Sequence, residues 1–153
     1  GTTSMIGATG LANCLYNAGT DSKIGFVGSH VSALPKSVLA IDYVDFILLN
    51  EGVYALWNIL RSNFSYENLK NIRGIGWKDN DGNLIINDPE GIVPQERMDI
   101  DLPGYAWDLL PMEKTPLDLY RSHVWHANFN ESIRTPYAAI YTSLGCVLAA
   151  NFA

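Results

Sequence analysis

The sequence has few basic residues and no long uncharged apolar run. Its 153 residues include 10 Lys and Arg against 16 Asp and Glu, a net charge of −6, and no Lys/Arg cluster offsets this balance. Such a chain repels a phosphate backbone, so we expect no nucleic-acid partner. Asp42 and Asp45 interrupt the most apolar stretch, residues 38–49. It is therefore shorter than the run of about 20 uncharged residues that a membrane-spanning helix needs, and we expect no membrane segment.

Cysteine is also scarce. Only Cys14 and Cys146 are present, far apart in the sequence, and they do not make the disulfide framework of a small secreted domain. The first residues lack the basic and apolar regions of a secretory signal. We therefore predict a reducing, cytoplasmic location. The length of the chain suits one modest domain.

Helical and strand patterns alternate in the first part of the chain. Residues 5–18 have apolar side chains at helical spacing, and Gly19 stands where a C-cap belongs. Short apolar strands are predicted over residues 23–27 and 43–49. This alternation predicts an α/β fold with a doubly wound, flavodoxin- or Rossmann-like parallel sheet.

Two further helices complete this pattern. Pro35 suits the first turn of a helix that follows the first strand. Residues 53–62 predict an amphipathic helix whose apolar face is formed by Ala55, Leu56, Ile59 and Leu60.

The predicted parallel sheet is partial. Doubly wound domains carry about five strands, and the first 62 residues supply two or three. The opening "GTTSM" suits the end of a strand that enters a loop and helix. We therefore expect the first half of the domain to lie upstream of residue 1, and the edge so exposed to favour a homodimer or strand exchange.

After residue 72 the pattern turns antiparallel. "RGIGWKDNDGNLIIND" predicts a β-hairpin with its turn at residues 80–82. Asp79, Asp81 and Asn83 resemble the start of a calcium loop, but the glutamate that should follow at fixed spacing is absent, so the hairpin is the preferred interpretation. Residues 88–125 contain most of the prolines and predict an extended connector, anchored by Leu109, Leu110, Tyr120 and Trp125.

Several motifs, in order, carry a resemblance to a known family. "VGSHVSALPKSVLAIDYVDFILLNEGVYAL" resembles the second half of the cobalamin-binding domain of cobalamin-dependent radical SAM proteins. In that family a Gly-Pro-His or Gly-Gly-Pro-His loop is followed by Ala-Leu-Pro, Asp-Tyr-Val and a Gly-Glu-Gly-Glu turn. "GIGWKDNDGNLIIND", "DLPGYAWDLLPM" and "YRSHVWHANF" resemble the family's connector, and "IRTPYAAIYTSLGC" resembles the first strand of its radical SAM barrel.

The resemblance implies a cobalamin site at the carboxyl ends of the parallel strands. Small residues in such loops let the backbone approach a ligand. The implied binding residues come from the opening loop and the loops after the two predicted strands; they are Thr3 and Ser4, with Thr2 beside them, then Gly28, Ser29 and His30, and finally Asn50, Glu51 and Gly52. Ser29 departs from the family's glycine or proline, and Asn50 departs from the first glycine of the acidic turn.

Two of these residues have competing interpretations. The loop that carries a cobalt-ligating histidine in some cobalamin proteins would lie upstream, so we expect His30 to hydrogen-bond within its loop. Glu51 is equally well explained as a ligand contact and as an acidic residue that favours the N-terminus of the following helix.

The end of the chain has the frame of a cluster loop without its ligands. The family's Cys-x-x-x-Cys-x-x-Cys loop binds a four-iron cluster that leaves one iron open for S-adenosylmethionine. Here Cys146 occupies the first position, Ala150 and Ala153 occupy the others, and Val147 replaces the usual proline. A methyl group cannot ligate iron, so Cys146 is at most a vestigial ligand and no iron–sulfur cluster is expected.

Another metal interpretation rests on the pair His123 and His126. An H-x-x-H pair can share a metal, but no third ligand is evident, and the neighbouring Tyr120 and Trp125 favour an anchored connector.

The sequence thus predicts three segments. Residues 1–72 form the C-terminal part of a cobalamin-binding domain, residues 73–135 a hairpin and connector, and residues 136–153 the first strand and degenerate cluster loop of a radical SAM barrel. The parent enzyme would use S-adenosylmethionine and cobalamin for methyl transfer or radical rearrangement, and this chain alone would be inactive. The alternative is a non-catalytic α/β binding or assembly module that has lost both cofactor sites. An ordinary dinucleotide-binding domain is weaker, since no G-x-G-x-x-G follows a strand.

Overall fold

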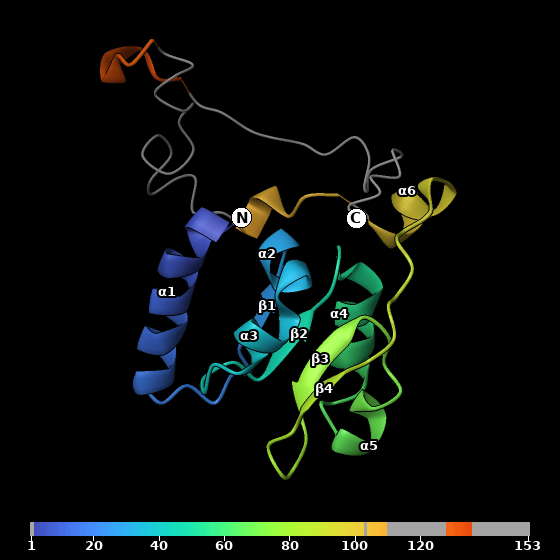
Figure 1. Ribbon diagram of the computed structural model, residues 1–153. Coiled ribbons are helices and arrows are strands. Elements are labelled where there is room, and N and C mark those ends of the chain that lie inside the picture. The colour runs from blue at the N-terminus through green and yellow to red at the C-terminus, as the bar shows by residue number, and fades with distance from the viewer. Residues whose placement is uncertain (1, 103, 110–127, 136–153) are drawn as a thin grey trace, which may run out of the picture. The chain divides into compact units, whose positions relative to one another are not determined.

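The structure, a computed structural model, describes residues 2–102, 104–109 and 128–135. It is a mixed α/β structure around one four-stranded sheet, in the order β1-β2-β3-β4 (Figure 1). The strands are β1 (Gly25–Val27), β2 (Phe46–Leu48), β3 (Ile75–Lys78) and β4 (Leu84–Ile86). The prediction of an α/β fold is confirmed, and the hairpin after residue 72 continues the same sheet.

The first two strands form the parallel pair that the sequence predicts, with Phe26 opposite Ile47. Two short helices connect them, α2 (Ser29–Ala33) and α3 (Pro35–Leu39). Pro35 stands at the first position of α3 as expected, because its missing N–H is not needed there and its fixed φ suits a helix.

The hairpin adds two antiparallel strands, with Ile47 opposite Gly76 and Trp77 opposite Ile85. Its turn is held by Asp79, whose carboxylate accepts hydrogen bonds from the backbone N–H of Asp81 and Asn83 at 2.9 and 2.8 Å. Gly82 supplies a φ of 80°. The hairpin interpretation is confirmed, and the Asp79 oxygens serve the turn itself.

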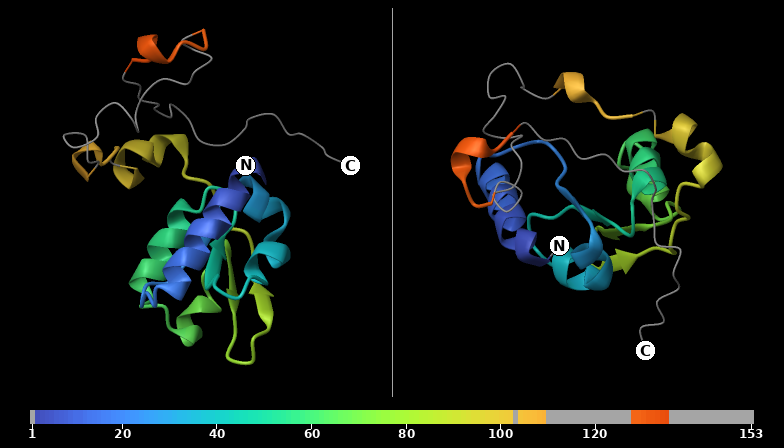
Figure 2. Two further views of the ribbon diagram at one scale, coloured as in Figure 1. Left: turned by 90° about the vertical axis from the view of Figure 1, so that its left-hand side faces the viewer. Right: turned by 90° about the horizontal axis from the view of Figure 1, so that it is seen from above.

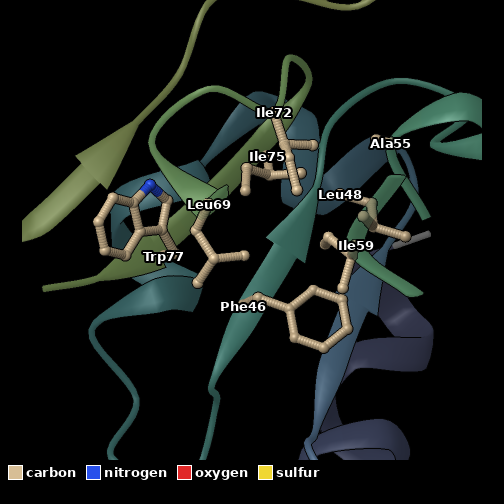
Figure 3. Packing of buried hydrophobic residues seen from close by; sticks show 8 residues of the cluster. All are labelled: Phe46, Leu48, Ala55, Ile59, Leu69, Ile72, Ile75 and Trp77. Atoms are coloured by element: carbon tan, nitrogen blue, oxygen red, sulfur yellow. The ribbon is translucent and has the colours of Figure 1, made fainter. Parts of the chain in front are cut away.

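One face of the sheet packs against α4 (Val53–Arg61) and α5 (Tyr66–Leu69). Alternate residues of β2 point to opposite faces, so Phe46 and Leu48 face these helices while Ile47 faces away. Figure 3 shows this cluster: Phe46, Leu48, Ala55, Ile59, Leu69, Ile72, Ile75 and Trp77.

The other face packs against α2 and α3. Its core includes Val31 and Leu39 from these helices, with Phe26 and Ile47 from the strands. Helix α1 (Met5–Asn17) follows a short 3₁₀ helix, η1 (Thr2–Ser4), and adds Ala12 to this cluster. Figures 1 and 2 show α1 beside the β1 end of the sheet. Gly19 has a φ of 73° after the helix, as its predicted place at the C-terminus requires.

The predicted apolar face of α4 is only half correct. Ala55 and Ile59 are buried at 0% and 3% exposure, but Leu56 and Leu60 are 41% and 65% exposed. Leu56 and Leu60 lie one position further along the chain, so each is rotated by about 100° from its buried neighbour. The core cluster packed against α4 therefore covers only the Ala55 and Ile59 side of the helix.

The described residues from 95 to 135 belong to a second compact unit, described by itself. Its described helices are short: η2 (Gln95–Arg97), α6 (Met98–Asp101), η3 (Trp107–Leu109) and η5 (Glu131–Ile133). Leu109 is 78% exposed, so the expectation that it anchors the connector is wrong. Leu110, Tyr120, His123, Trp125, His126 and the whole predicted barrel strand with Cys146 lie outside the described residues. In the described part of the chain, no helix is long and apolar enough to cross a membrane.

Candidate functional site

The candidate site lies at the carboxyl ends of β1 and β2. Because these strands are parallel, the loops that follow them leave the same edge of the sheet. The first loop is Gly28, which leads into α2, and the second is residues 49–52, which lead into α4. Figure 1 shows the start of the chain at this same end, close to α2.

Gly28 has a backbone conformation that other residues rarely adopt. Its φ is 123° and its ψ is 179°, a region that is essentially confined to glycine. No heavy atom lies within 4 Å of the place that a Cβ would occupy. The backbone here is therefore open to close approach by another group, and a side chain would be strained even though there is room for it.

Ser32 connects the two loops. Its hydroxyl oxygen accepts a hydrogen bond of 2.8 Å from the backbone N–H of Asn50. Asn50 has a φ of 56°, which asparagine tolerates better than most residues. This explains how asparagine can stand where the resembled turn has glycine. The sequence analysis did not single out Ser32, because a serine inside a predicted helix gives no signal of its partner.

Gly52 is required by both its conformation and its neighbours. Its φ is 68°, and an added Cβ would lie 2.8 Å from Leu48 Cβ and 3.3 Å from Val27 Cγ2. The second loop therefore passes directly over the ends of both parallel strands. Any larger residue would push the start of α4 away from the sheet.

Glu51 carries the least satisfied polar group of the site. Its Oε2 is buried and has no hydrogen-bond partner among the described residues. A buried carboxylate oxygen without a partner costs free energy, which a ligand N–H or O–H could recover. Glu51 Oε2 is thus available to accept a hydrogen bond from outside the chain, and Glu51 also directly precedes the N-cap of α4.

The opening segment reaches the start of α2 through a hydrogen bond. Thr2 Oγ1 and His30 Nδ1 lie 3.0 Å apart, so His30 hydrogen-bonds to the opening segment and not within its own loop. Thr3, Ser4 and Ser29 are exposed at the same end, and no hydrogen bond of their side chains is seen in the described residues. The structure therefore brings Thr2, Gly28, His30, Asn50, Glu51 and Gly52 to one end of the sheet, with Thr3, Ser4 and Ser29 at its margin.

The site carries few charged side chains. Glu51 is its one acidic side chain and His30 its one basic side chain among the predicted residues. Within the residues that the structure describes, no group of three or more His, Cys, Asp or Glu side chains could hold a metal ion. The arrangement suits a ligand bound through hydrogen bonds and backbone contact.

Comparison with known proteins gives no relative: no family model matches the chain, and neither the curated proteins nor the solved structures contain a significant match.

Proposed function

We propose that residues 1–72 are the C-terminal part of a doubly wound cobalamin-binding domain, and that this chain binds cobalamin at the loops after β1 and β2. In this proposal the remainder of the chain is the connector and first barrel strand of a cytoplasmic radical SAM enzyme. The parent would use S-adenosylmethionine and cobalamin for methyl transfer or radical rearrangement, while the chain alone is inactive.

The observation that carries the proposal is that Gly28 and Glu51 lie in two loops at the same end of the sheet. Gly28 leaves its backbone open to close approach, and Glu51 Oε2 is a buried acceptor without a partner among the described residues. Cobalamin carries primary amides around its ring, and their N–H groups are suitable donors for a carboxylate. Bound cobalamin would supply a cobalt centre that carries a methyl group.

The chain's own residues would hold and orient the ligand. The Ser32 hydroxyl fixes the backbone of the second loop through Asn50. Gly52 lets that loop lie close over Leu48 and Val27. Thr2 and His30 would form one margin of the site through their contact.

The test is a titration of the purified chain with hydroxocobalamin, followed by visible absorption and equilibrium dialysis. Saturable binding is expected, and Glu51→Gln should raise Kd by roughly tenfold because a charged acceptor becomes neutral. Glu96→Gln, which removes the same charge from an exposed residue, should leave Kd unchanged. Absence of binding by a well-folded chain would overturn the assignment for this chain.

A second candidate is the non-catalytic α/β assembly module. The observation that favours it is the exposed apolar surface of α1, where Ile6 and Leu11 are 84% and 64% exposed. This candidate predicts self-association without any cobalamin binding. The titration therefore separates the two candidates.

A further inference from the structure

We propose that the outer surface of α1 is a docking surface for a second copy of this chain. We define this outer surface by five residues that helical spacing places away from Ala12 and Met5, which pack in the core: Ile6, Gly7, Gly10, Leu11 and Cys14. The proposal does not rest on cobalamin binding.

The first argument is exposure. Helix α1 has 13 residues, and Ala12 is its one buried residue. Ile6, Leu11 and Leu15 are 84%, 64% and 46% exposed. An amphipathic helix normally turns its apolar side chains toward the core, whereas α1 turns three large ones toward solvent.

The second argument is charge. Residues 1–20 contain no Asp, Glu, Lys or Arg, although the chain carries 16 acidic and 10 basic residues. A solvent-facing helix usually presents charged side chains on its outer side. The outer surface of α1 instead has the composition of an interface core, from which charged residues are depleted.

The third argument is the pair of outer glycines. Gly7 and Gly10 each have no heavy atom within 4 Å of a Cβ position, so nothing within the described structure requires a glycine there. Each costs α1 about 1 kcal/mol relative to alanine. Small residues at this spacing allow another helix to approach closely, with Ile6 and Leu11 on either side.

A second copy fits this surface better than a charged partner. A two-fold contact brings the same patch of both copies together, and two acidic copies repel each other where both present carboxylates. In a chain of net charge −6, the uncharged outer surface of α1 avoids this repulsion. Helix α1 also lies beside β1 (Figure 2), at the end of the sheet where no further strand pairs in the described residues.

The experiment is sedimentation velocity of the full 153-residue chain over a wide concentration range. We expect a monomer–dimer equilibrium. Gly10→Glu should raise the dimer Kd by at least roughly tenfold, because it places two carboxylates in the contact. Gly91→Glu is the matched control: it introduces the same side chain at another open, exposed glycine and should leave Kd unchanged.

The Gly10→Glu variant is expected to fold, since Gly10 has open space and glutamate forms helices better than glycine.

Alkylation of Cys14 gives a second measurement of dimerisation that introduces no new charge. Cys14 is an exposed free thiol, so in a Cys146→Ser background its alkylation should slow as concentration favours the dimer. A chain that stays monomeric, a dimer insensitive to Gly10→Glu, or a Cys14 alkylation rate independent of concentration would each overturn the proposal. Binding of α1 only to a different protein would do the same.

Discussion

The backbone N–H of Asn50 donates a hydrogen bond of 2.8 Å to the hydroxyl of Ser32, which joins the loop after β2 to the helix after β1. Ser32→Ala removes this acceptor and should lower the free energy of unfolding by about 1 kcal/mol. Urea denaturation followed by circular dichroism measures it. Ser37→Ala, at an exposed position of α3, is the matched control. An equal effect of both substitutions would contradict the role of the Ser32 bond.

Gly52 should tolerate substitution worse than another glycine of positive φ. Gly82 has a φ of 80° and open space, whereas the Gly52 Cβ position lies 2.8 Å from Leu48 Cβ. Gly82→Ala should cost about 1 to 2 kcal/mol from backbone strain alone. Gly52→Ala should lower the free energy of unfolding by about 1 kcal/mol beyond this, because the added methyl group crowds Leu48. If the two variants unfold at the same urea concentration with the same slope, the close contact with Leu48 does not matter.

The two sides of α4 should respond differently to truncation. Ile59 is 3% exposed and Leu60 is 65% exposed. Ile59→Ala should therefore lower the free energy of unfolding by about 2 to 5 kcal/mol, through lost burial and the cavity left behind. Leu60→Ala should change it by less than about 0.5 kcal/mol. A larger loss for Leu60→Ala would mean that this side of α4 is covered in solution.

The turn of the β3–β4 hairpin should depend on pH through Asp79. Hydrogen bonds from the Asn83 side chain and backbone hold the pKa of Asp79 below its ordinary value of 3.8. A lowered folded-state pKa means that the stabilisation is present above the unfolded-state pKa and is lost as the pH falls through the folded-state pKa. The stability difference between the unmodified chain and Asp79→Ala should therefore shrink in acid below about pH 4.

Asn83→Ala tests the cause of that pH dependence. It removes the side-chain donor to Asp79, which lies 2.9 Å from the carboxylate, so the pKa of Asp79 should rise toward its ordinary value. NMR of the Asp79 carboxyl carbon during an acid titration gives the pKa directly. An unchanged titration curve would show that the Asn83 side chain does not hold the carboxylate.

Glu51 offers a test of the site that needs no ligand. Its buried Oε2 has no partner among the described residues, so the ligand-free chain gains little from the charge. Glu51→Gln should leave the free energy of unfolding unchanged or raise it slightly. A loss of more than about 2 kcal/mol would mean that the carboxylate already has a partner within the chain.

The sequence by itself determined the local elements. Gly19 after α1, Pro35 at the start of α3 and the Asp79 turn are governed by backbone conformation over a few residues, so their positions could be predicted. The parallel pairing of β1 and β2 also followed from the helices between them. The residues of the candidate site came from a resemblance in the loops that these elements connect.

Only the tertiary structure decided how these elements meet. The antiparallel addition of β3 beside β2, the contact of Thr2 with His30 and the bond from Asn50 to Ser32 join residues far apart in the chain. The same is true of burial on α4, where Ile59 and Leu60 are neighbours of equal apolar character with opposite exposure. Apolar spacing shows which residues can share a face, but the width of the surface packed against that face determines which of them are buried.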